Sequence, residues 1–162
     1  MRPIVSTAAL MAAAALLMFP QGVEGTLEAD WRKEAEQRGY IIVSPASKVQ
    51  GKLHVAGHSN GGLSAFHVAA KYPTYFSTVT GYPGLLDGPD RPRMAILKPL
   101  CLFMHVGDLD EGWKGAMQNE AEEMRKAGYR IRITVEPKQV HRLKAQEVNL
   151  SPRLFDEIES CR

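Results

Sequence analysis

A continuous apolar run of strand length, LCLFMHV, occupies residues 100–106. A strand with one face in water alternates apolar and polar residues, and this run does not. The pattern is typical of a strand that is buried on both faces, as in a parallel sheet with helices on either side. We therefore expect residues 100–106 to lie inside such a sheet.

Strand patterns and helix patterns alternate along the rest of the chain. Strands are expected over residues 40–45, 52–56, 76–84 (ending in a turn), 100–106 and 129–137, the last of them near a sheet edge because it alternates apolar and basic residues. Helices are expected over residues 26–39, 63–71 and 115–127, and after Ser151-Pro152, which reads as an N-cap followed by proline at the first helical position. This alternation predicts an α/β fold with a mainly parallel, doubly wound sheet.

The connection between the first two of these strands is short. Only residues 46–51 separate them, whereas neighbouring parallel strands need a crossover of about a dozen residues. Either these two strands are not neighbours in the sheet, or a helix has been lost between them.

The N-terminal segment has two alternative roles. Residues 1–25 contain Arg2, an apolar run rich in alanine and leucine, and then small residues, which is the pattern of a secretory signal peptide. Cleavage would make the protein secreted or periplasmic; otherwise it is expected in the cytoplasm. The alternative is a buried strand over residues 14–19 with a loop at residues 21–25. In either case we expect no stable membrane span, and a catalytic domain over residues 26–162.

The composition limits the classes of function. The 162 residues are 44% hydrophobic and 23% charged, as in one ordinary globular domain. A net charge of +2 is too small to indicate nucleic acid as a partner. Cys101 and Cys161 lack the spacing of metal ligands, so no metal is expected, and Cys101 is interpreted as a small buried side chain. A disulfide between the two cysteines would require export; the sequence leaves it open, as it leaves the oligomeric state.

The segment GHSNGG, residues 57–62, lies between an expected strand and an expected helix. The pattern Gly-x-Ser-x-Gly between a strand and a helix is typical of a nucleophile elbow. This turn is so sharp that side chains at the glycine positions would clash. The hydroxyl of Ser59 would then stand clear at the sheet edge. The backbone N–H of Asn60, at the start of the following helix, would donate to an oxyanion.

A nucleophilic serine needs a base, and histidine is the usual one. Of the five histidines, His54 and His105 fall within strands, His58 belongs to the elbow, and His67 lies along a helix. His141 follows the last expected strand, in a loop that could reach the serine. We therefore predict His141 as the base.

The acid is expected in the segment GDLDEGW, directly after the buried strand. Its role is to orient the imidazole and stabilise its charge. Asp110 is the predicted acid because it lies at the tip of the loop, and Asp108 is the alternative. A purely structural role, in which one of the two caps the next helix, is also open.

The order Ser59, Asp110, His141 is that of the α/β-hydrolases. The segments GHSNGG, HVGDLDEGW and VHRL resemble the serine, acid and histidine motifs of that superfamily. The first is similar to the motif of secreted esterases, polyhydroxyalkanoate depolymerase-like proteins and prolyl-oligopeptidase-like peptidases. The resemblance covers about residues 20–162 and implies an α/β-hydrolase fold that is truncated at its N-terminus.

The resemblance also implies a second oxyanion donor. In the family it comes from a His-Gly-type loop after an earlier strand, and here Gln21-Gly22-Val23 stands at that place. If the N-terminal segment is a strand, Gly22 or Val23 supplies this donor; if it is cleaved, the mature chain has no evident one. The sequence departs from the family in lacking the first strands and the helix between residues 45 and 52. It also has Val140 where a glycine often precedes the histidine.

These features predict a serine hydrolase that cleaves an ester by acyl transfer without a metal or organic cofactor. The expected partner is a small-molecule ester or peptide. Two alternatives remain: a serine peptidase of the prolyl-oligopeptidase type, and a catalytically impaired, hydrolase-like binding protein, which the missing elements suggest.

Overall fold

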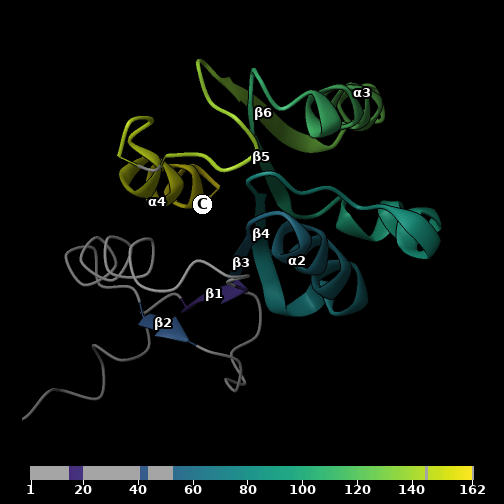
Figure 1. Ribbon diagram of the computed structural model, residues 1–162. Helices are drawn as coiled ribbons and strands as arrows, with labels where there is room; N and C mark the ends of the chain where they lie inside the picture. The colour runs from purple at the N-terminus through teal and green to yellow at the C-terminus, as the bar shows by residue number, and fades with distance from the viewer. Residues whose placement is uncertain (1–14, 20–40, 44–52, 145, 162) are drawn as a thin grey trace, which may run out of the picture.

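The computed structural model describes residues 15–19, 41–43, 53–144 and 146–161. It contains a six-stranded sheet in the order β2-β1-β3-β4-β5-β6, in which each neighbouring pair is parallel (Figure 1). The strands are β1 (Ala15–Phe19), β2 (Ile41–Val43), β3 (Leu53–Gly57), β4 (Phe76–Gly81), β5 (Cys101–Gly107) and β6 (Arg130–Glu136). The strands predicted from residue 40 onwards are therefore present, and β6 lies at an edge of the described sheet, as expected.

The position of β1 explains the short connection between residues 43 and 53. β1 pairs with β2 on one side and with β3 on the other. The two strands that the short segment joins are therefore not neighbours, which was the first of the two alternatives. The expected helix over residues 26–39 and the loop at residues 21–25 lie outside the described residues.

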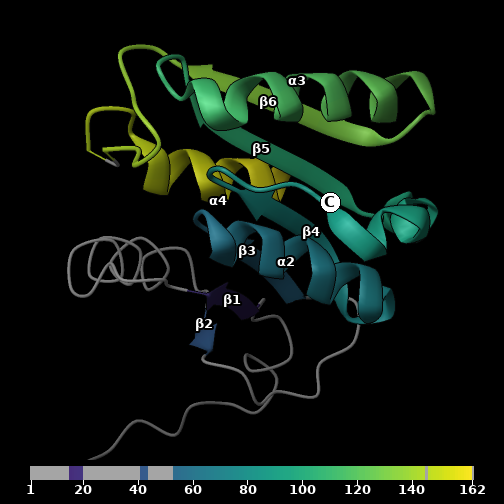
Figure 2. The same ribbon diagram turned by 45° about the vertical axis from the view of Figure 1, so that its right-hand side comes forward.

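Helices cover both faces of the sheet, as a doubly wound fold requires. The helices α2 (Asn60–Lys71) and α3 (Glu111–Lys126) lie on one face, and α4 (Leu150–Ser160) lies on the other (Figures 1 and 2). Neighbouring residues of β3 point to opposite faces: Val55 belongs to the apolar cluster under α2 and α3, and Ala56 to the cluster under α4. Short 3₁₀ segments, η2 (Pro73–Tyr75) and η3 (Gly88–Leu97), complete the described elements.

Strand β5 is buried along its whole length. Its residues Leu102, Met104 and Val106 join the core under α2 and α3. On the α4 face, Cys101 forms a disulfide with Cys161 at the end of α4. Cys101 is buried, as expected, and the disulfide that the sequence left open is formed with a cysteine 60 residues further along the chain.

Three helices begin earlier than their sequence patterns predict, and the first of them, α2, begins at Asn60 rather than Leu63. α3 begins at Glu111 rather than Gly115, because the Asp110 carbonyl already accepts the Lys114 N–H at 2.9 Å. α4 begins at Leu150 with Asn149 at its N-cap, so Ser151 is not the cap. Proline remains compatible with the first turn of α4, because the N–H groups there have no partner within the helix.

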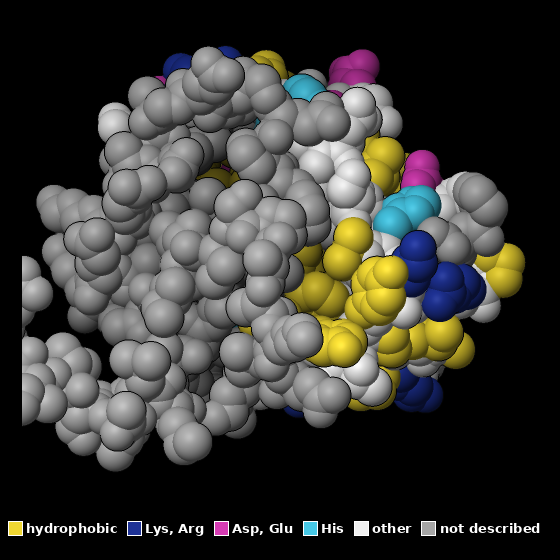
Figure 3. Space-filling view, turned by 90° about the horizontal axis from the view of Figure 1, so that it is seen from below, with side chains coloured by type: hydrophobic (Ala, Val, Ile, Leu, Met, Phe, Trp, Pro, Cys, Tyr) yellow, Lys and Arg dark blue, Asp and Glu magenta, His cyan; other side chains and the backbone are white. Residues whose placement is uncertain are grey.

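On the face of the molecule seen in Figure 3, hydrophobic side chains of described residues gather in one area, and Lys and Arg side chains lie beside them. None of the described helices is long and apolar enough to span a bilayer.

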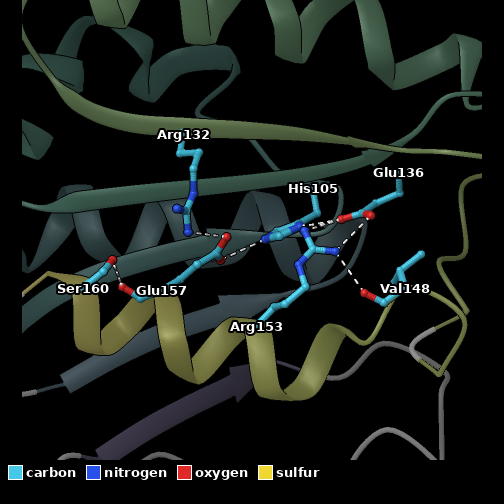
Figure 4. A network of polar contacts seen from close by, with 7 residues as sticks. All are labelled: His105, Arg132, Glu136, Val148, Arg153, Glu157 and Ser160. Carbon is cyan, nitrogen blue, oxygen red and sulfur yellow. Dashed lines mark hydrogen bonds and ion pairs between the residues drawn. The ribbon is translucent and has the colours of Figure 1, made fainter.

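A buried charge network joins β5 and β6 to α4 (Figure 4). His105 is fully buried; one ring nitrogen lies 2.9 Å from Glu136 Oε1 and the other 2.9 Å from Glu157 Oε2. Because carboxylates only accept, both nitrogens donate, and the imidazole is protonated. Arg132 donates to Glu157 at 2.8 Å, and Arg153 donates to Glu136 at 2.9 Å. The network therefore holds alternating charges between the sheet and α4.

The pKa shifts in this network follow from its contacts. Burial lowers the pKa of His105, but the hydrogen bonds and charges of Glu136 and Glu157 outweigh it, so the pKa is raised overall. Burial raises the pKa of Glu136, but hydrogen bonds from His105 and Arg153 outweigh it, so this pKa is lowered. Both shifts favour the charged forms.

The pH dependence of unfolding tests the network. A His105 pKa above the unfolded value of 6.5 contributes stability that is complete below pH 6.5 and is lost as the pH rises through the folded pKa. We expect His105→Gln to lower the free energy of unfolding, measured by urea denaturation, by about 3 kcal/mol below pH 6.5. This difference from wild type should shrink as the pH rises. Arg125→Gln, which breaks an exposed pair on α3, is the control and should show a small, constant difference. A constant difference for His105→Gln as well would contradict the assignment.

Candidate active site

Ser59 lies at the turn between β3 and α2, with φ 57° and ψ −122°. A positive φ is strained for a residue with a side chain, and such strain is typical of a nucleophile elbow. The flanking glycines are required by space: a Cβ on Gly57 would lie 2.1 Å from Gly61 O, and one on Gly62 would lie 2.1 Å from Pro83 O. The glycines that bracket the serine thus allow the sharp turn to form.

The three side chains singled out from the sequence meet in one hydrogen-bonded chain. His141 Nε2 lies 2.8 Å from Ser59 Oγ, and His141 Nδ1 lies 2.8 Å from Asp110 Oδ2. Because the carboxylate only accepts, Nδ1 carries the proton, and Nε2 is left to accept the Ser59 hydroxyl. The arrangement is that of a serine, a base and an acid that orients the base.

The Asp110 carboxylate and the His141 imidazole differ in their exposure to solvent. Asp110 is 7% exposed, and the His141 side chain is 39% exposed. The carboxylate is therefore held in place beneath the imidazole, while one edge of the imidazole remains accessible. Ser59 is likewise partly exposed.

The other candidates are occupied elsewhere. Asp108 does not face His141; its Oδ1 accepts the backbone N–H of Gln139 at 3.2 Å. His54 bonds to Thr78 Oγ1 at 2.8 Å, and His67 pairs with Asp87 at 2.9 Å. His105 belongs to the buried network described above.

Two further residues contact His141. His58 Nε2 donates to the His141 carbonyl at 3.2 Å, and the ring of Trp113 lies 5.5 Å from the His141 ring. Burial lowers the pKa of His58, which favours its neutral form. No contact of His58 or Trp113 with His141 was predicted from the sequence, although the two residues lie inside the segments GHSNGG and GDLDEGW.

The oxyanion donors are described only in part. Asn60 is the first residue of α2, so its N–H has no acceptor within the helix and points towards the end where negative charge is favoured. Gly22 and Val23 lie outside the described residues, and their role stays a prediction. Within the described part of the chain, no group of three His, Cys, Asp or Glu side chains is arranged to hold a metal ion.

Comparisons with known proteins agree on the architecture. No protein-family model and no curated protein matches the sequence. Solved structures do match: an S-formylglutathione hydrolase, FrmB, from Staphylococcus aureus has a TM-score of 0.63 at 11% identity and covers 90% of this chain and 83% of its own. A ferulic acid esterase has a TM-score of 0.68 at 16% identity, covering 91% and 84%.

A third similar structure is alpha/beta hydrolase domain-containing protein 10 from mouse. Its TM-score is 0.62 at 12% identity, covering 91% of this chain and 90% of its own. These identities are low, so the comparison concerns the fold alone. The chain therefore shares the α/β fold of these hydrolase structures.

Proposed function

We propose that this chain is a serine hydrolase that cleaves an ester by acyl transfer. The observation that carries the proposal is the continuous chain of contacts from Ser59 through His141 to Asp110, with 2.8 Å at each step. In the sequence, Asp110 and His141 lie 31 positions apart, and Ser59 and His141 lie 82 positions apart. Their meeting at the end of a strained elbow is the arrangement that nucleophilic catalysis needs.

The proposed reaction begins when Ser59 Oγ attacks the ester carbonyl. His141 Nε2 takes the hydroxyl proton, and Asp110 stabilises the imidazolium that forms. The Asn60 N–H donates to the oxyanion of the tetrahedral intermediate. His141 then gives its proton to the leaving alcohol, and the acyl group remains on Ser59. Water attacks this acyl-enzyme with His141 as base, and the acid product leaves.

An ester is favoured over a peptide as the substrate. Two of the similar structures carry the names of an esterase and of an S-formylglutathione hydrolase. Leu109 and Val140 directly precede Asp110 and His141 in the sequence and are 59% and 53% exposed, so they offer apolar surface close to the proposed site. A small ester with an apolar group suits such a surface.

A fluorophosphonate probe tests the proposal against the binding-protein alternative. Such a probe phosphonylates only an activated serine, so we expect the folded protein to be labelled on Ser59, located by mass spectrometry of its peptides. Heat-unfolded protein, in which the contact with His141 is lost, should not be labelled. Absence of labelling in the folded protein would contradict the enzyme and leave the binding-protein alternative. Faster turnover of an amide than of the matching ester would favour the peptidase.

We further propose that the protein functions in an oxidising compartment, secreted or periplasmic. The Cys101–Cys161 disulfide supports this, since disulfides persist in such compartments. The place of β1 between β2 and β3 supports the opposing alternative, in which residues 15–19 are kept and the protein stays in the cytoplasm. Mass spectrometry decides between the two: a chain that begins near residue 24 and has its two cysteines oxidised is expected for export, and a chain that keeps residues 15–19 would contradict it.

A further inference from the structure

Two loops that are distant in sequence approach each other at the proposed site. The acid loop, residues 107–110, follows β5, and the histidine loop, residues 137–144, follows β6. Asp110 and His141 lie on these loops, and the hydrogen bond between them depends on how the loops are held. Leu143 anchors the end of the histidine loop in the apolar cluster under α4, but His141 and Val140 are partly or largely exposed, so core packing does not by itself fix the His141 side chain.

Hydrogen bonds continue from one loop to the other beyond the ends of the strands. The Asp108 N–H donates to Glu136 O at 2.9 Å, and the Leu109 N–H donates to Gln139 O at 3.0 Å. The Gln139 N–H in turn donates to Asp108 Oδ1 at 3.2 Å. Of these three hydrogen bonds, two join backbone groups and the third uses the Asp108 carboxylate. This carboxylate accepts the backbone N–H of Gln139, which lies two positions before His141.

The two loops are also in close contact at Gly107. A Cβ at that position would lie 2.2 Å from Gln139 O. No other residue type fits there without moving the histidine loop. The acid loop therefore touches the histidine loop at Gln139 through Gly107, Asp108 and Leu109.

Gln139 also closes the histidine loop around His141. Its side chain is buried, with 3% exposed. Its Oε1 accepts the Lys144 N–H at 2.9 Å, and its Nε2 donates to Glu147 at 3.0 Å. One residue therefore fixes the segment on both sides of His141: its backbone binds the acid loop, and its amide binds the residue three positions after the histidine.

We propose that Asp108 and Gln139 form a positioning pair that keeps His141 within hydrogen-bond distance of Asp110 and Ser59. This inference rests on the proposed function and adds two residues to it. Neither touches the reacting atoms. Asp108 acts as a hydrogen-bond acceptor, so its negative charge is dispensable, whereas the charge of Asp110 is not.

The pair of substitutions Asp108→Ala and Asp108→Asn separates an acceptor from a charge. Asparagine keeps an oxygen for the Gln139 N–H, and alanine does not. With p-nitrophenyl acetate as substrate, we expect kcat to fall roughly 10- to 100-fold in the alanine variant with little change in KM, because displacing a catalytic group by about 1 Å costs this much. The asparagine variant is expected to recover most of that loss. An equal loss in both variants, or none in the alanine variant, would overturn the proposal.

Gln139→Met gives an independent measurement. Methionine keeps the length and burial of the side chain but removes its bonds to Lys144 and Glu147. We expect the same pattern, a lower kcat with KM nearly unchanged, while circular dichroism and the unfolding midpoint show a folded protein. An unchanged kcat in folded Gln139→Met would contradict the role assigned to the amide.

Proton NMR gives a readout that does not depend on activity. The Nδ1 proton of His141, shared with the Asp110 carboxylate, is expected to give a far-downfield resonance. It should persist in Asp108→Asn and broaden or disappear in Asp108→Ala. If wild type shows this resonance but no fluorophosphonate labelling, the proposed function fails while the positioning pair stands. If the resonance and the labelling are both unchanged in Asp108→Ala, the positioning pair fails while the proposed function stands.

Discussion

Replacing Ser59 by alanine is expected to abolish ester hydrolysis, lowering kcat by roughly 10⁴- to 10⁶-fold. Among the described residues, the Ser59 hydroxyl is the nucleophilic group that His141 Nε2 contacts, at 2.8 Å. Alanine removes the nucleophile and relieves nothing at the elbow, since it has the same backbone strain as serine. Initial rates with p-nitrophenyl acetate measure the loss, and titration of the variant with a slowly hydrolysed ester checks that binding survives.

Ser64→Ala is the matched control for this substitution. Ser64 lies on the same helix, is exposed, and donates its hydroxyl to Asn60 O at 2.9 Å. Its removal should leave kcat within a few-fold of wild type, as is usual for a surface substitution. Hydrolysis at an undiminished rate by Ser59→Ala would show that another group is the nucleophile.

Replacing Asp110 by asparagine is expected to lower kcat by roughly 10⁴-fold while leaving the fold intact. The amide can turn its NH₂ towards His141 Nδ1, which must then accept rather than donate. The proton moves to Nε2, and Nε2 can no longer take the Ser59 proton. The side chain is buried at 2.8 Å from the imidazole, so water does not substitute for the lost carboxylate.

Asp156→Asn, an exposed carboxylate of α4, is the control for the loss of one negative charge. It is expected to retain wild-type kcat. Measuring both variants by steady-state kinetics and by fluorophosphonate labelling distinguishes a lost base from a lost fold. If Asp110→Asn kept its activity while Asp108→Asn lost it, the alternative acid of the sequence analysis would be correct.

Local sequence patterns correctly predicted structural features that depend on residues close together in the sequence. The apolar run at residues 100–106 predicted a strand buried on both faces, because a continuous apolar pattern leaves no face for water, and β5 is such a strand. The glycines around Ser59 predicted a sharp turn. The structure gives the reason, because a Cβ on Gly57 would clash with Gly61 and a Cβ on Gly62 would clash with Pro83. Both features depend on residues that are close in sequence.

Local patterns did not predict which distant segments pair with each other. The segment at residues 46–51 is short because β1 lies between the two strands that it joins, and the pattern of residues 46–51 contains no sign of β1. The disulfide was likewise left open, since the sequence spacing of Cys101 and Cys161 does not report how far apart α4 and β5 lie. In each case the deciding element comes from another part of the chain.

The sequence by itself determined the kinds of residue at the proposed site and their order along the chain: a serine in an elbow, carboxylates after the buried strand, and a histidine after the last strand. Only the tertiary structure shows which of the two carboxylates, Asp110 or Asp108, faces His141. Both lie in the same short loop, and no local pattern distinguishes them. Because β5 and β6 are parallel neighbours, their carboxyl ends bring the two loops together. The contacts with Gln139 then turn Asp108 towards the backbone and leave Asp110 facing His141.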